Sequence, residues 1–280
     1  MLFFYFALFL FGISIGSFLN TVIYRSFAKK NLLGRSFCDH CKRNLEPKDL
    51  IPILSFILLK GKCRYCKKPI SWQYPLVEFI SGLILPLTIY FLFHFSPLSS
   101  QIKEIFFKDI FSQVEFLLFL LFLLSILFSF IVFFVSDIKY MAVPEIPLLA
   151  SLFCAFFYQI IGKHLFPQSF DLKKTFIFTL GVASFFVFIV FLTKEKGMGK
   201  GDIYLASLVS LFLGKEVGIF AVYFSFVLGA IFSLILVFTK KKSFKSKIPF
   251  GPFLIISGFL FFFFENFFSA PFFKFLDYFI

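Results

Sequence analysis

Long apolar runs are the feature of this sequence that most restricts its fold. A run of about 18 or more apolar residues is long enough to cross the hydrocarbon core of a bilayer as a helix. The chain is 60% hydrophobic and only 15% charged, whereas a soluble domain carries about 25% charged residues. The sequence therefore predicts an all-α polytopic membrane protein with about eight transmembrane helices. The predicted spans are residues 2–23, 75–95, 114–136, 143–161, 175–192, 203–213, 217–238 and 251–268.

The basic residues orient this bundle. The net charge is +13, and 21 of the 28 Lys and Arg residues lie in loops 25–74, 137–142, 193–202 and 239–250. Eight crossings place these four loops on one side, which the positive-inside rule makes the cytoplasm. We therefore expect a multi-pass protein of the inner (cytoplasmic) membrane with both termini outside the cytoplasm. Charges that gather between apolar runs indicate contact with membrane lipid, and they argue against nucleic-acid binding.

The sixth predicted span is unusually short. Residues 203–213 would form a helix of about 17 Å, against about 30 Å of hydrocarbon. The span begins directly after Asp202, which suits a site where water enters the membrane region. The alternative is that the predicted ends of this span are misplaced.

Four of the five cysteines lie in one basic loop. Cys38 and Cys41 form one C-x-x-C pair, and Cys63 and Cys66 form a second pair 21 residues later. Two such pairs supply four thiolates to one tetrahedral zinc ion. Because the loop is predicted to be cytoplasmic, where thiols stay reduced, zinc is favoured over disulfides. A four-thiolate site has no open coordination position, so the predicted zinc is structural.

Two aspartates border predicted spans at the cytoplasmic side. Asp137 follows the third span and Asp202 precedes the sixth. Two carboxyl groups in one poorly hydrated site share a proton, and such a pair activates a water and protonates a leaving amine. Gly199 and Gly201 would let a substrate backbone approach Asp202. The alternative is that both acids cap helices or pair with lysines at the interface.

Several motifs occur in an order that resembles the type IV prepilin peptidases, also called leader peptidase/N-methyltransferases. The matching elements are Gly16-Ser17-Phe18-Leu19-Asn20 through Arg25, the two C-x-x-C pairs, Tyr74-Pro75-Leu76-Val77-Glu78, Asp137 with Pro144, Gly199-Lys200-Gly201-Asp202, and Ile248-Pro249-Phe250-Gly251-Pro252-Phe253. Two positions depart from the family pattern, namely Glu145 after Pro144 and Tyr204 after Asp202. Neither departure touches a carboxylate of the predicted pair.

The resemblance implies a GxGD-type aspartyl protease of type IV pilus or type II secretion systems. Its substrates would be prepilins or pseudopilins, whose leader peptide is cut at the cytoplasmic face. Asp137 and Asp202 would share the general base and acid roles. Many members of the family then methylate the new N-terminal residue with S-adenosylmethionine.

The resemblance also implies residues for substrate binding or methyl transfer. These candidates are Asn20, Arg25, Glu78, Gly199 and Gly201. For Glu78 the alternative is a structural pairing with Arg25.

The predicted organisation has four parts. Residues 1–24 form the first span, 25–74 the four-cysteine zinc loop, 75–113 the second span with an outer loop, and 114–280 a six-helix protease core. A different class of function is a non-catalytic zinc-loop scaffold or a transporter. A transporter would carry acids or broken helices near the midplane, whereas Asp137 and Asp202 are predicted at the inner face.

Overall fold

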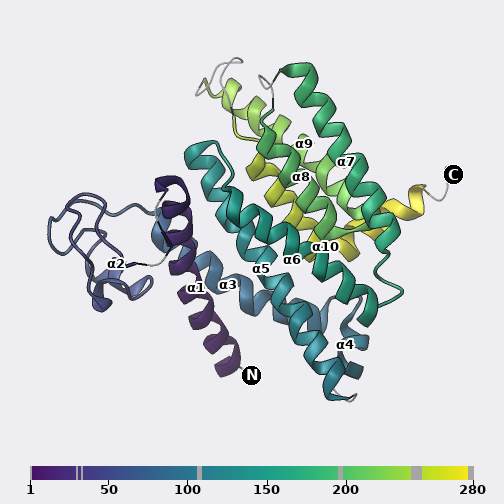
Figure 1. The fold of residues 1–280 in the computed structure, drawn as a ribbon, viewed down its shortest axis with the longest axis horizontal. Helices are drawn as coiled ribbons and strands as arrows, with labels where there is room; N and C mark the ends of the chain where they lie inside the picture. Colours follow the sequence, from purple (N-terminus) through teal and green to yellow (C-terminus); the bar gives the residue numbers. More distant parts are fainter. Residues whose placement is uncertain are drawn as a thin grey trace. The chain divides into compact units, whose positions relative to one another are not determined.

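The computed structural model describes residues 2–29, 31–32, 34–105, 109–194, 198–240 and 248–276, without the side chains of 215, 216 and 265–276. Every regular element in these ranges is a helix, and the only extended pairings there are the isolated bridges Phe37–Asn44 and Lys62–Pro69. This confirms the predicted all-α class. The chain divides into two compact units, Met1–Phe91 and Leu92–Ile280, which are described separately below (Figure 1).

The first unit holds two long helices and the loop between them. Its elements are α1 (Leu2–Ala28), the 3₁₀ helix η1 (Pro47–Asp49), α2 (Leu54–Leu58) and α3 (Gln73–His94), of which the last three residues fall in the second unit. Both long helices are apolar and long enough to span a membrane. They enclose the loop that was predicted between the first and second spans.

Arg25 explains why α1 continues past the predicted start of the loop. This arginine is buried in the last turn of the helix. Its guanidinium donates hydrogen bonds of 2.6–3.2 Å to the backbone carbonyls of Asn31, Leu32, Gly34 and Arg35. Because the returning chain satisfies the charge, Arg25 lies inside a helix that ends only at Ala28.

Glycines bring α1 and α3 into backbone contact. A Cβ atom at Gly12 would lie 2.6 Å from the carbonyl oxygen of Ser81, and one at Gly16 would lie 2.7 Å from Cα of Glu78. In membranes, small residues at helix interfaces permit this kind of close approach. The two spans of the first unit are therefore held by backbone packing.

The second unit is a bundle built around α8. Its helices are α4 (Ser99–Ile105), α5 (Ile110–Tyr140), α6 (Glu145–Leu165), α7 (Leu172–Thr193), α8 (Lys200–Leu213), α9 (Lys215–Phe238) and α10 (Gly251–Leu276). Helix α8 packs against α6, α7, α9 and α10. Aromatic rings fill the interior; for example, the fully buried Phe130 meets Phe212 and Phe259 edge to face at 5.6 and 5.4 Å.

The predicted count of eight spans is not confirmed. Six of the described helices are long and apolar enough to cross a membrane, namely α1, α3, α5, α6, α7 and α9. Helix α8 has 14 residues, or about 21 Å of length, and the described apolar part of α10 is Gly251–Phe264. The chain is thus a multi-pass membrane protein with a short helix in the middle of its larger unit.

The end of α8 shows how a short helix is tolerated there. Gly214 ends the helix with a φ of +69°, a value that favours glycine. The buried Gln159 of α6 donates through Nε2 to the carbonyls of Leu211 and Phe212, at 2.7 and 3.0 Å. A helix end away from water needs such partners for its free carbonyls. Gln159 therefore replaces water at the carboxyl end of α8.

We predict that Gly12→Ala destabilises the first unit. Its Cβ would press on backbone atoms of α3, which cannot rotate away, so the free energy of unfolding should fall by about 1–3 kcal/mol. Thermal unfolding in detergent measures this change. The matched control is Gly181→Ala in α7, where a Cβ meets nothing within 4 Å and alanine favours the helix. An unchanged melting temperature for Gly12→Ala would contradict the described packing.

Candidate functional site

Asp137 lies buried in the last turn of α5. Its side chain is 7% exposed, and its Oδ2 atom has no hydrogen-bond partner among the described residues. The helix ends shortly afterwards, where Met141 adopts a left-handed φ of 49°. A buried carboxylate oxygen without a donor is costly, and inside a membrane protein an ionisable residue of this kind marks a functional site.

Asp202 lies in the first turn of α8. The N-cap of this helix is Gly199, and Asp202 is its third residue, so Asp202 caps the helix from its third position and is not the N-cap residue itself. Its Oδ2 atom accepts a hydrogen bond of 3.0 Å from the backbone N–H of Gly199. Negative charge is favourable at the amino end of a helix. The first turn of α8 therefore fixes the position of the Asp202 carboxyl group through this hydrogen bond.

The two acids lie near helix ends that meet one another. Gly251, the first residue of α10, lies against Asp137: a Cβ at Gly251 would be 2.5 Å from Oδ2 of Asp137 and 2.9 Å from Cδ1 of Leu205. Leu205 lies three residues beyond Asp202 on the same helix. The ends of α5, α8 and α10 thus meet around Asp137 and Leu205, and we predict that the carboxyl groups of Asp137 and Asp202 form one site there.

The space beside Asp202 is open on its glycine side. A Cβ at Gly199 would meet nothing closer than 3.9 Å, whereas one at Gly201 would lie 3.0 Å from the side chain of Val143. Packing therefore explains the glycine at 201 but does not require one at 199.

The four cysteines of the loop come together as predicted. Their Sγ atoms all lie within 4.8 Å of one another, and those of Cys38 and Cys66 are 3.9 Å apart. All five cysteines of the chain are free thiols. Four sulfurs bound to zinc at about 2.3 Å would be about 3.8 Å apart, so the cluster fits a tetrahedral metal ion.

The two cysteine pairs share one turn, a likeness that the sequence analysis missed. The N–H of Lys42 donates to the carbonyl of Cys38, whose own N–H donates to the carbonyl of Arg43. The same two bonds link Lys67, Cys63 and Lys68. Lys42 and Lys67 both have a φ of 58°. Each pair therefore presents its two sulfurs in the same way.

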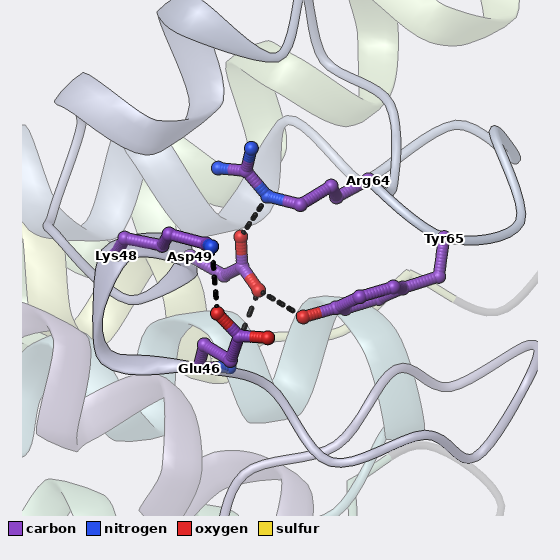
Figure 2. Close-up of polar contacts among 5 residues, drawn as sticks. All are labelled: Glu46, Lys48, Asp49, Arg64 and Tyr65. Atoms are coloured by element: carbon purple, nitrogen blue, oxygen red, sulfur yellow. Dashed lines mark hydrogen bonds and ion pairs between the residues drawn. The ribbon is translucent and has the colours of Figure 1, made fainter.

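A polar network links the second cysteine pair to η1 (Figure 2). The carboxylate of Asp49 accepts from Nε of Arg64 at 2.6 Å, from the hydroxyl of Tyr65 at 3.0 Å and from the N–H of Glu46 at 3.2 Å. Burial acts to raise the pKa of Asp49, but these hydrogen bonds, with that of Arg64 foremost, outweigh it and hold the pKa below its usual value. Sequence reasoning did not single out this network, because only the fold brings residue 49 beside residues 64 and 65.

The other predicted functional residues of the first unit form hydrogen bonds with backbone groups of the same unit. Glu78 accepts a hydrogen bond of 2.7 Å from the N–H of Ile53, and Asn20 donates one of 3.1 Å to the carbonyl of Tyr74. Since Arg25 binds four loop carbonyls, the alternative pairing of Glu78 with Arg25 is not what the structure shows. A role of these residues in methyl transfer stays a prediction.

Comparisons with known proteins agree with this arrangement. The model of the bacterial peptidase A24 N-terminal domain matches residues 10–93, and that of the type IV leader peptidase family matches residues 122–234. A prepilin leader peptidase/N-methyltransferase of Vibrio cholerae serotype O1 is 32% identical over 261 residues, covering 89% of this chain and 92% of that protein. The chain belongs to the type IV leader peptidase family. A protein of Bacillus subtilis with the same name is 28% identical over 248 residues, covering 88% of both chains.

This family assignment fits the two units of the chain. The N-terminal domain match falls almost wholly within the first unit, which holds the cysteine loop. The leader peptidase match lies within the second unit and includes Asp137 and Asp202, but it ends before Gly251. No solved structure gives a significant match.

Proposed function

We propose that this protein is a membrane-embedded aspartyl endopeptidase that removes the leader peptide of type IV prepilins or pseudopilins. The observation that carries the proposal is the pair of carboxyl groups at the ends of α5 and α8. One has a buried oxygen without a partner among the described residues, and the other is held by a helix N-terminus. Membership of the leader peptidase family supports the same activity. A non-catalytic scaffold or a transporter gives no reason for this pair.

The pair supplies both proton transfers of peptide hydrolysis. One carboxylate accepts a proton from water as the water oxygen attacks the scissile carbonyl carbon. The other carboxylic acid donates a proton to the leaving amine as the C–N bond breaks. Two adjacent carboxyl groups share one proton in this way because they cannot both ionise in a poorly hydrated site. The titration belongs to the pair, so we assign neither proton to one aspartate.

The rest of the active site positions the substrate. The open side at Gly199 would admit the extended backbone of a leader peptide beside Asp202. Gly251 would keep the carboxyl group of Asp137 in place, because any side chain there would displace it. We propose that this active site lies at the cytoplasmic face of the inner membrane, with both termini outside, and the distribution of basic residues among the loops supports this orientation.

Zinc is the metal that the cysteine cluster suits. Cys38, Cys41, Cys63 and Cys66 would hold it as a closed four-thiolate site that orders the loop, with no catalytic role. The relatives are also named N-methyltransferases, so methylation of the new N-terminus is the second activity that we propose. S-adenosylmethionine would supply the methyl group when bound. Since Asn20, Arg25 and Glu78 bind their own chain, we derive no step from them.

We predict that Asp137→Asn and Asp202→Asn each slow leader cleavage by about 10²- to 10⁴-fold, the usual loss when general acid–base catalysis is removed. A gel-shift assay with a co-purified prepilin in detergent measures the rate. Asp171→Asn is the matched control, because Asp171 caps α7 through a 3.1 Å bond from Lys174 N–H. Cleavage at the wild-type rate in either active-site variant would refute the assignment.

Gly251→Ala should reduce cleavage while the protein stays folded. The added methyl group would press on Oδ2 of Asp137 and move the carboxyl group away from its partner. A misplacement of about 1 Å costs about 10²-fold in rate. The comparison is with Gly181→Ala, and melting temperature is recorded for both variants. Full activity in Gly251→Ala would mean that the close approach of α10 does not position Asp137.

Purified protein should contain one zinc ion per chain, and Cys38→Ser should lose it. Three thiolates bind zinc more weakly than four, and the loop has little core of its own to hold it in place. Mass spectrometry of metals in the purified protein gives the stoichiometry. Cys154→Ser, which changes a cysteine outside the cluster, should keep the metal. A metal-free loop with disulfides would contradict the proposal.

A further inference from the structure

The loop of the first unit carries an apolar surface that leader cleavage does not explain. Six large apolar side chains are exposed on or next to α2: Leu50, Ile51, Leu54, Ile57, Leu58 and Trp72. We call these residues the α2 patch. Within α2, Leu54, Ile57 and Leu58 have the spacing of one helix face, and the side chains of Ile57 and Leu58 are 63% and 70% exposed. An exposed cluster of this kind marks a binding surface.

Packing within the loop holds α2 in one orientation. The ring of Phe56 in α2 lies 4.9 Å from the ring of Trp72 and faces Gly61, where a Cβ would be only 3.2 Å away. Ile53, just before α2, adopts a φ of +60°, which is strained for a β-branched residue. Its N–H is fixed by the buried carboxyl group of Glu78 at 2.7 Å. The loop thus maintains the exposed face rather than folding it inward.

The hydrogen bond between Ile53 and Glu78 fixes how deep α2 lies relative to the membrane. Glu78 is the sixth residue of α3, about 7–8 Å along the helix from its first residue. Helix α3 has 22 residues, or about 33 Å, which is close to the thickness of the hydrocarbon core. The first turn of α3 therefore lies at the headgroup level, and α2 begins where the headgroups meet the acyl chains. In Figure 1 the loop lies to the side of α1 rather than beyond its end.

The charged residues around the α2 patch indicate the kind of surface that the patch binds. Residues 48–68 contain six basic side chains and one acid, Asp49, which is paired with Arg64. The basic residues that follow α2 include Lys60, Lys62 and Lys68, all exposed. Basic residues beside an apolar face bind anionic lipid.

We propose that the α2 patch inserts into the headgroup boundary of an anionic lipid bilayer and anchors the cysteine loop against the membrane surface. The two membrane-spanning helices that flank the loop keep it at this surface. The proposed anchor does not involve the carboxyl pair, so the anchor and leader cleavage can be tested independently of each other.

The single tryptophan of the chain makes this proposal testable. Trp72→Phe combined with Ile57→Trp moves the only indole onto α2. The full-length protein is placed in vesicles of phosphatidylglycerol and phosphatidylcholine that contain brominated lipid, and fluorescence quenching by the bromines is compared with quenching by aqueous iodide. The matched control is Trp72→Phe with Asn44→Trp, at an exposed position of the same loop outside the patch.

The expected result is strong quenching of the indole at 57 by lipid brominated near the headgroup, with loss of quenching by iodide. The indole at 44 should show the reverse. Quenching at 57 that does not depend on phosphatidylglycerol would overturn the role of anionic lipid. Quenching of the indole at 57 by iodide would overturn insertion, because the patch would then face water. Quenching by neither agent would also overturn insertion, because protein would then cover the patch. Leader cleavage by the same two variants is measured in parallel, so a failed anchor is not mistaken for a failed protease.

Discussion

Hydrocarbon offers no hydrogen-bond partner, and the polar groups of this protein are arranged around that constraint. Arg25 ends α1 by binding four carbonyls of the chain that follows. Gln159 donates hydrogen bonds to the free carbonyls at the end of α8. Glu78 holds the N–H of Ile53. In each case a buried polar side chain does for the backbone what water does at the surface of a soluble protein.

Among the buried side-chain atoms that lack a hydrogen-bond partner in the described residues, Oδ2 of Asp137 is the one carboxylate oxygen. Asp202 keeps one bond to the first turn of its own helix. Helix α8 has 14 residues and packs against α6, α7, α9 and α10. Its amino end brings an acid toward the ends of α5 and α10.

The sequence was sufficient for features that depend on spacing along the chain. Apolar runs predicted the helices, and two C-x-x-C pairs predicted a four-thiolate cluster whose sulfurs the structure brings together. Spacing also marked residues 203–213 as short for a span, and the structure has them in a helix of 14 residues. Spacing did not place Asp49 beside Arg64, or Gly251 beside Asp137. These contacts join residues far apart in sequence, and only packing decides them.

The shared turn of the two cysteine pairs has a consequence for how the loop responds to metal supply. Each half offers two sulfurs in the same geometry, and neither half completes a tetrahedral shell alone. Binding to one half therefore gains little until the other half closes over the ion, so the loop would pass between an ordered and a disordered state without a stable half-loaded form. When zinc is scarce, the whole loop would therefore become disordered in a single step.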